Sequence, residues 1–362
     1  MDQRQRQRHL PSTISEFRGR FTAASFFSDM LHSRNRLSLL AVVVMSLTSL
    51  TSAAFLPLDS SIRRYRNSSA RAPLTTFPRG GSSNPTSLSA VIFDNAPFWQ
   101  AQSVIAGTNA LGLVISLATG SHLHLDLLGT GAFGLMAAVP FMNGVSLLPR
   151  VQWSSLAVTA WATKLAGFLF FRALKVKQDA RLTDILSTSG GTTMFWVLSW
   201  LWGAVCSLPH TLGTTSSDPG NPTAFKVGVA MYVVGLITET LADYQKWVFK
   251  VSNPGQFCDV GLSSISQHPN FFGNLLVWSG IFLMNAPALV DPMAKTMVGK
   301  YSRVGLSLLS PLFLCPYFYG QASGAISNTV ELFEKKYGDN PGYRDYVDTV
   351  PLIIPNPLNM FQ

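Results

Sequence analysis

Charged residues are scarce in this chain. Only 12% of its 362 residues are Asp, Glu, Lys or Arg, whereas 47% are hydrophobic. Soluble domains usually carry about 25% charged residues, so much of the charge expected for a soluble surface is missing. The composition disfavours a soluble domain and is typical of an integral membrane protein.

Cysteine is also rare. The three cysteines, Cys206, Cys258 and Cys315, are odd in number and far apart, and two of them fall in apolar stretches. This pattern argues against a disulfide framework or a cysteine metal site, and it suits small residues of a core. His122 and His124 are the one close histidine pair, and the sequence offers no evident third ligand beside them, so we expect no metal.

The net charge of +9 is concentrated at the N-terminus. Twelve arginines precede residue 80, namely Arg4, Arg6, Arg8, Arg18, Arg20, Arg34, Arg36, Arg63, Arg64, Arg66, Arg71 and Arg79. Without that segment the positive excess largely disappears, so the charge does not indicate a nucleic-acid partner.

The first 90 residues have the features of a targeting presequence. Residues 30–54 combine a basic start, a short apolar run at 37–47 and small residues at 51–54, as a secretory signal peptide does. The alternative is a membrane anchor, but the run is short for a span of about 20 residues. Residues 60–89 contain no acid and are rich in Ser, Arg, Thr and Pro, which is typical of a plastid transit peptide.

A signal peptide followed by Phe55 and a transit-like segment, 55–90, resembles the bipartite presequences of algae with secondary plastids. The interpretation is therefore a plastid membrane protein, and the alternative is a protein of the endoplasmic reticulum with a basic tail. The remaining residues, 91–362, are predicted to form one membrane domain.

Apolar stretches recur along that domain. They cover 96–118, 123–142, 152–171, 191–208, 224–243, 271–290 and 303–320. Each is close to the length that a helix needs to cross about 30 Å of hydrocarbon. The sequence predicts an all-α fold, a polytopic membrane bundle of six to seven transmembrane helices, with the lipid bilayer as a partner.

Polar loops indicate how the bundle is oriented. Lys and Arg occur in 172–190 and 244–270, whereas 209–223 has none. With seven spans the two basic loops and the C-terminal tail share one face of the membrane. Three basic residues do not fit this orientation, because they would fall on the opposite face of the membrane: Lys295, Lys300 and Arg303.

Ionisable residues close to that basic face are the candidate site. Glu239 and Asp243 are four apart, so they share a helix face at the end of an apolar run. Such residues in a membrane span are costly and suggest function, although both could lie solvated in the interface. Gln245 and Lys246 follow on the next turn.

The stretch SISQHPNFFGN at 264–274 places His268 before a proline. Pro269 suits the first turn of a helix and disfavours a helical His268, so the histidine should precede a helix N-terminus. Free backbone N–H groups and the helix dipole favour an anion there. Asn270, Gly273 and Asn274 could face that ligand, although a turn that merely starts a helix is the plainer interpretation.

These motifs resemble those of the steroid 5α-reductase-like membrane proteins, over about residues 160–355. The resemblance lies in Arg172 with Asp179 and Arg181, in Glu239 to Lys246, in Gly261 with His268 to Gly273, and in Gly342 to Tyr346. It implies NADPH bound by the C-terminal helices. The residues implied to bind it are Arg172, Asp179, Arg181, Glu239, Asp243, Gln245, Lys246, His268, Asn270, Gly273, Asn274, Tyr343 and Tyr346.

The resemblance implies a reductase that transfers hydride to a carbon–carbon double bond of a hydrophobic substrate. Gln267 stands where the family usually has an arginine, and Asn274 where it often has an acid. Isoprenylcysteine methyltransferases share the architecture, so an S-adenosylmethionine-dependent methyltransferase is an alternative, as is a scaffold without catalysis. Tyr232, Tyr317 and Tyr319 are candidate proton donors, but the sequence assigns no catalytic residue.

Overall fold

The computed structural model describes residues 96–142, 148–176 and 182–361. All of them belong to one compact unit, 81–362, and they contain helices and loops but no strand. The predicted signal peptide and transit-like segment lie outside the described residues, and the division at residue 90 stays a prediction.

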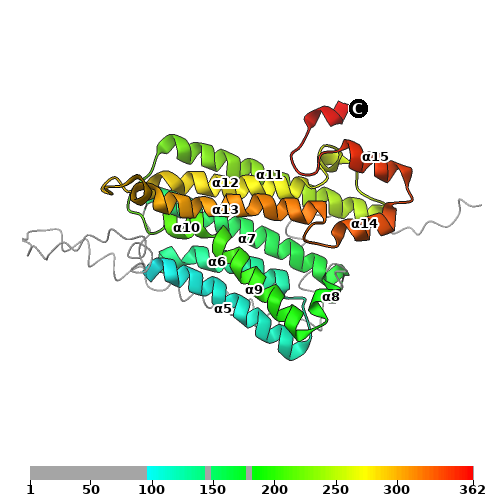
Figure 1. Ribbon diagram of the computed structural model, residues 1–362, viewed down its shortest axis with the longest axis horizontal. Coiled ribbons are helices and arrows are strands. Elements are labelled where there is room, and N and C mark those ends of the chain that lie inside the picture. The colour runs from blue at the N-terminus through cyan, green and yellow to red at the C-terminus, as the bar shows by residue number, and fades with distance from the viewer. Residues whose placement is uncertain (1–95, 143–147, 177–181, 362) are drawn as a thin grey trace, which may run out of the picture. The chain divides into compact units, whose positions relative to one another are not determined.

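Every predicted apolar stretch coincides over most of its length with a helix of the structure (Figure 1). The helices are α5 (Ala96–Thr119), α6 (Leu125–Met142), α7 (Pro149–Val176), α8 (Thr183–Leu186), α9 (Ser189–Cys206), α10 (Leu208–Gly213), α11 (Pro222–Ser252), η1 (Gly261–Ser264), α12 (Pro269–Asn285), η2 (Ala286–Leu289), α13 (Met297–Ser323), α14 (Thr329–Tyr337), α15 (Pro341–Thr349) and η3 (Pro357–Phe361). The prediction of an all-helical membrane bundle is confirmed.

Four segments among the described residues are long and apolar enough to cross a membrane: α5, α7, α11 and Pro269–Leu289. Helix α6 is apolar but shorter, and the polar start of α9 and the two prolines of α13 lower the apolar character of those helices. The number of six to seven transmembrane helices therefore stays a prediction for α6, α9 and α13.

The closest helix contact joins α11 and α12, which run antiparallel. Gly228 and Gly235 on α11 meet Gly280 and Gly273 on α12. A Cβ at Gly235 would lie 2.6 Å from the carbonyl oxygen of Gly273, and one at Gly228 would lie 2.6 Å from that of Gly280. Seven residues separate the glycines of each helix, about two turns, so each pair repeats on one face. Small residues let membrane helices pack backbone to backbone in this way.

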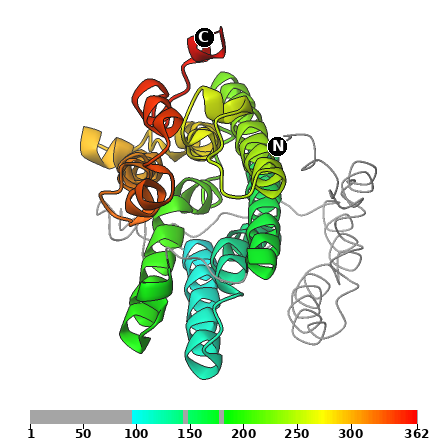
Figure 2. The same cartoon turned by 90° about the vertical axis from the view of Figure 1, so that its right-hand side faces the viewer.

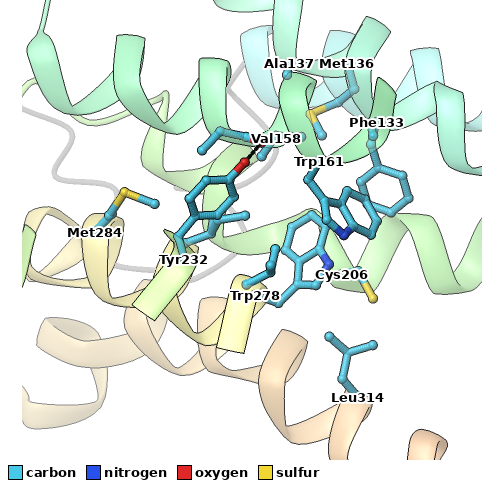
Figure 3. Close-up of a cluster of buried hydrophobic side chains, with 14 of the residues drawn as sticks. Phe133, Met136, Ala137, Val158, Trp161, Cys206, Tyr232, Trp278, Met284 and Leu314 are labelled. Carbon is cyan, nitrogen blue, oxygen red and sulfur yellow. Dashed lines mark hydrogen bonds between the residues drawn. The ribbon is translucent and has the colours of Figure 1, made fainter. Parts of the chain in front are cut away.

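A cluster of aromatic residues fills the centre of the bundle. Phe133, Trp161 and Trp278 come from α6, α7 and α12, and their rings lie 5.1–5.3 Å apart between centroids (Figure 3). Met136, Cys206 and Leu314 surround them. The arrangement buries one large side chain from each of several helices, so it fixes the mutual positions of these helices by shape.

The two ends of the bundle differ in chemistry. At one end, α7, α11 and α13 finish and α12 begins, and the segments α14 and α15 lie there too (Figure 1). Figure 2 looks onto this end, where the red C-terminal segment lies beside the yellow loop that joins α11 to α12. The sequence predicted that the basic loops and the C-terminal tail share a face, and the arrangement of the helix ends agrees.

The opposite end contains a buried polar cluster that the sequence analysis did not identify. The Arg150 guanidinium donates to the carbonyl oxygens of Gly213 (3.0 Å), Ser216 and Asp218 and to Asn285 Oδ1 (2.7 Å). Arg303 donates to Leu212 O and Thr215 Oγ1. Arg303 is one of the three basic residues that did not fit the predicted orientation of the bundle. In the structure its guanidinium is hydrogen-bonded to residues at the end of α10 and just after it.

We expect Gly235→Ala to destabilise the protein. Its added methyl group has no room against the Gly273 carbonyl, and overpacking of this kind costs about 1–3 kcal/mol. The measurement is thermal unfolding of the purified protein in detergent. Gly167→Ala on α7 is the control, because a Cβ there meets nothing within 4 Å. Equal melting temperatures for the two variants would contradict the close packing of α11 against α12.

Candidate functional site

A cavity lies at the end of the bundle where α11 finishes. Its walls come from the last turns of α11, from the loop that follows, and from α14 and α15; its lining residues are Lys246, Lys250, Phe257, Cys258, Gln267, His268, Phe333, Tyr337, Tyr343, Tyr346 and Val347. Its volume is about 50 Å³. Four residues predicted to bind a cofactor, Lys246, His268, Tyr343 and Tyr346, therefore meet in one place.

Aromatic rings form one side of this cavity. The Phe257 ring lies 5.4 Å from that of Tyr343 and 5.5 Å from that of Tyr346, and the Tyr337 ring lies 5.6 Å from that of Tyr343. The Tyr346 hydroxyl donates to the carbonyl oxygen of Ser263 at 3.0 Å. Flat, rigid walls of this kind suit a planar ring of a ligand.

Lysine ammonium groups supply the positive charge of the cavity. Lys250 Nζ donates to the Tyr337 hydroxyl at 2.7 Å and lies 4.8 Å from the centre of that ring. Lys246 lines the same cavity one turn earlier on α11. Two ammonium groups in a hollow with aromatic walls make it suited to an anion that carries a ring.

The histidine of the cavity is neutral. Burial, together with the nearby charge of Lys246, lowers the pKa of His268 to about 3. Its ring stacks on Phe271 with 4.9 Å between centroids. Burial also raises the pKa values of Tyr343 and Tyr346, so both phenols keep their protons. At neutral pH the His268 ring offers one N–H donor and one acceptor nitrogen but no charge.

His268 directly precedes α12, which begins at Pro269, as the sequence predicted. Its backbone N–H donates to the carbonyl oxygen of Leu352, and that of Gln267 donates to Pro351 O. The Gln267 side chain donates to the carbonyl oxygens of Val347 (3.0 Å) and Val350 (2.7 Å), where α15 ends. Gln267, which stands where the steroid 5α-reductase-like proteins usually have an arginine, thus links the end of α15 to the start of α12 by hydrogen bonds.

Gln245 also has a structural contact. Its Oε1 accepts the backbone N–H of Leu262 at 2.9 Å, and a Cβ at Gly261 would lie 2.5 Å from the same oxygen. Gly261 has a φ of +62°, a conformation that favours glycine. The pair holds η1 against α11, which places the loop before His268.

Glu239 lies inside the bundle and not in the cavity. It is 3% exposed and accepts hydrogen bonds from Trp161 Nε1 on Oε2 and from Asn274 Nδ2 on Oε1, each at 3.0 Å. Lys164 Nζ lies 3.0 Å from Oε2. Three helices, α7, α11 and α12, therefore meet at one carboxylate, and its donors satisfy both oxygens.

Three more of the predicted residues, Asp243, Gly273 and Asn274, lie close to Glu239. Asp243 is one turn along α11 from Glu239, within reach of the charges of Lys164, Arg172 and Lys246. Asn274 turns to Glu239, and Gly273 packs against the α11 backbone, where a Cβ would lie 2.6 Å from Glu239 N.

Asn270 is half-buried on the first turn of α12, next to the cavity-lining His268. Asp179 and Arg181 lie outside the described residues.

Most of the predicted residues that the structure describes fall into two groups. Lys246, His268, Tyr343 and Tyr346 line the cavity, whereas Glu239, Gly273 and Asn274 belong to the contact of the membrane helices. The sequence analysis missed Lys250, Phe257 and Tyr337 in the cavity and Trp161 and Lys164 beside Glu239. Spacing could have identified two of them, because Lys250 follows Lys246 by four residues, and Lys164 follows Trp161 by three.

The histidine pair and the candidate proton donors have partners elsewhere. His124 Nε2 donates to the carbonyl oxygen of Gly112 at 2.9 Å, and its ring stacks on Trp196. Within the described part of the chain no group of three His, Cys, Asp or Glu residues could hold a metal. The Tyr232 hydroxyl donates to Ala157 O at 2.7 Å (Figure 3), Tyr317 stacks on Phe313, and Tyr319 is exposed.

Comparison with known proteins gives one match. A family profile described as a protein of unknown function, DUF1295, matches residues 112–350, about two thirds of the chain. A search of curated proteins and a search of solved structures found no match.

We expect Glu239→Gln to destabilise the protein strongly, since it leaves the Lys164 ammonium without its carboxylate. Removing one partner of a buried pair costs about 3–5 kcal/mol. The Lys164 side chain is 22% exposed, which favours the lower end of that range. The check is a double-mutant cycle in thermal unfolding with Lys164→Met. The double variant should recover most of the loss, and additive losses would show that the two charges are not coupled.

Proposed function

The chain belongs to the DUF1295 family of proteins of unknown function, and from that premise we propose that it is a membrane reductase that uses NADPH to reduce a carbon–carbon double bond in a hydrophobic substrate. The family is related to the steroid 5α-reductase-like proteins. One observation carries the proposal: Lys246, His268, Tyr343 and Tyr346, from three separate parts of the sequence, line one cavity.

The residues of the cavity suit a phosphorylated ring compound. Lys246 and Lys250 provide ammonium groups for phosphate, and the rings of Phe257, Tyr343 and Tyr346 provide flat apolar surface. Neutral His268 can donate or accept one hydrogen bond without adding charge. A lysine ammonium binds phosphate as a point charge, which offsets the missing arginine at position 267.

The size of the cavity sets a condition on binding. Pockets for small molecules and cofactors measure about 300–1,000 Å³, whereas this one measures about 50 Å³. A bound NADPH would therefore extend beyond this cavity, or α14 and α15 would move away from the end of α11 to enlarge it. The contacts that resist the movement are the Lys250–Tyr337 hydrogen bond and the Tyr346 hydrogen bond to Ser263.

The reaction needs a hydride and a proton for each double bond reduced. NADPH, when bound, supplies the hydride, and the proton comes from a protein group or from water. An apolar bundle of helices suits a lipid-like substrate that reaches the site from the bilayer. The substrate is thus a hydrophobic small molecule with an activated double bond.

The methyltransferase alternative uses the same cavity with a different ligand. S-adenosylmethionine carries a positive sulfonium and no phosphate, so two lysines in the wall disfavour it relative to NADPH. A scaffold without catalysis would bind neither. The lysine charges therefore favour the reductase over both alternatives.

We expect purified protein to bind NADPH more tightly than S-adenosylmethionine, and Lys246→Ala to weaken NADPH binding about ten- to a hundredfold. A hydrogen bond to a charged group contributes about 1.5–3 kcal/mol, and 1.4 kcal/mol corresponds to about a factor of ten. Calorimetric titration measures this. Lys226→Ala is the control, because Lys226 lies near the opposite end of α11. S-adenosylmethionine binding alone would support the methyltransferase, and binding of neither ligand would support the scaffold.

We propose that the protein resides in a plastid membrane, because the acid-free segment 60–89 follows a signal-like run at 30–54. A fluorescent protein fused to residues 1–90 should reach the plastid of an alga with secondary plastids. Phe55→Ala in the same fusion should leave the fluorescence outside it, with Phe77→Ala as the matched control. Secreted or endoplasmic-reticulum fluorescence from the intact leader would refute the plastid assignment.

A further inference from the structure

A second hollow lies on the outside of the bundle, between α5 and α9, and has a volume of about 160 Å³. Ala106, Asn109 and Ala110 of α5 and Trp196, Val197 and Trp200 of α9 line it. Ala110, Val197 and Trp200 are exposed, so the hollow opens outward from an apolar surface. It shares no residue with the cavity proposed for NADPH.

The sequence explains why a groove forms here. Gly112 packs directly on Trp196, since a Cβ at Gly112 would overlap the indole ring at 2.1 Å. This contact brings α5 and α9 together at one level. On the N-terminal side of Gly112, Ala106 and Ala110 have short side chains and leave space beside the large rings of α9.

Asn109 is the polar residue of this groove, and it is only 2% exposed. Its Nδ2 donates to the carbonyl oxygen of Ile105 at 2.8 Å. Because a carbonyl oxygen only accepts hydrogen bonds, the amide nitrogen must face Ile105 O, and Oδ1 is the amide atom turned away from it. Asn109 Oδ1 is buried without a hydrogen-bond partner among the residues that the structure describes. An acceptor left unpaired in an apolar wall favours a ligand that brings a donor.

We propose that this groove binds a neutral, ring-bearing lipid alcohol whose hydroxyl donates to Asn109 Oδ1. A dry apolar cavity of about 150 Å³ holds benzene, so a groove of this volume holds one ring of a larger lipid. The walls of alanine, valine and tryptophan offer apolar contact to the ring. They contain no basic side chain for a phosphate group.

The depth of Asn109 supports the same class of ligand. It lies 13 residues from Ala96 and 10 from Thr119, which correspond to about 20 Å and 15 Å along α5. A phospholipid headgroup stays at the surface, and its acyl chain carries no donor. An uncharged hydroxyl costs much less free energy than a charged headgroup to bring to this depth, and a hydrogen bond to Asn109 Oδ1 offsets part of that cost.

The test uses the full-length protein in phosphatidylcholine nanodiscs with a photoactivatable sterol as the probe. The sterol is compared with its methyl ether, which has the same shape but no hydroxyl donor. The measured quantity is cross-linking to the α9 peptide that contains Trp196 and Trp200. We expect the alcohol to label this peptide about three- to tenfold more than the ether, the ratio that one net hydrogen bond provides.

Two variants locate the interaction. Asn109→Leu should lower labelling by the alcohol to the level of the ether, and Ala110→Phe should abolish labelling by both because its ring fills the groove. Leu111→Phe is the control, since Leu111 is exposed on α5 and does not line the groove.

Equal labelling of the unmodified protein by alcohol and ether would overturn the proposal without any variant. Labelling that persists in Ala110→Phe would also contradict the proposal. So would a photoactivatable phosphatidylcholine that labels the α9 peptide and competes equally with the sterol.

Discussion

The backbone contact between α11 and α12 is the constraint on which the site depends. Gly228, Gly235, Gly273 and Gly280 bring the two backbones into direct contact where the helices meet. Beside this contact the Asn274 amide donates to the Glu239 carboxylate across the interface at 3.0 Å. The loop between the same two helices contains η1 and ends at His268, so the contact also determines where the histidine enters the cavity.

Glu239 turns this pair of helices into a group of three. Trp161 and Lys164 reach it from α7, and the Trp161 ring is at the same time part of the aromatic cluster with Phe133 and Trp278. One tryptophan therefore joins the polar interior to the apolar core. A change at the Glu239 carboxylate would therefore disturb the packing of Phe133 on α6 and Trp278 on α12, through the shared contact with Trp161.

The sequence predicted the helices well because the apolar stretches are long and have clear ends. Pro269 as the first residue of α12 follows from local chemistry alone, and so does His268 before it. The site was predicted only in part. Glu239 and Asn274 were predicted as ligand contacts because polar residues near a membrane face suggest function, and the structure shows that Asn274 donates to Glu239 across a helix interface.

The same limit applies to Gln267, whose partners, Val347 and Val350, are about 80 residues away. No local pattern reveals a partner at that separation, so tertiary structure decides the role. Phe257 and Tyr337 of the cavity wall were missed for the same reason, since they meet only after the chain end has folded back.

That fold-back has a consequence for the order in which the protein is made. Ile265, Ser266, Gln267 and His268 form hydrogen bonds with residues 347–356, so the chain end closes one wall of the cavity. While the ribosome is still making α14 and α15, the long helices can already enter the membrane, but the cavity has no outer wall. The helical bundle is therefore completed before the cavity, and a chain that ends before α14 and α15 would lack the outer wall of that cavity.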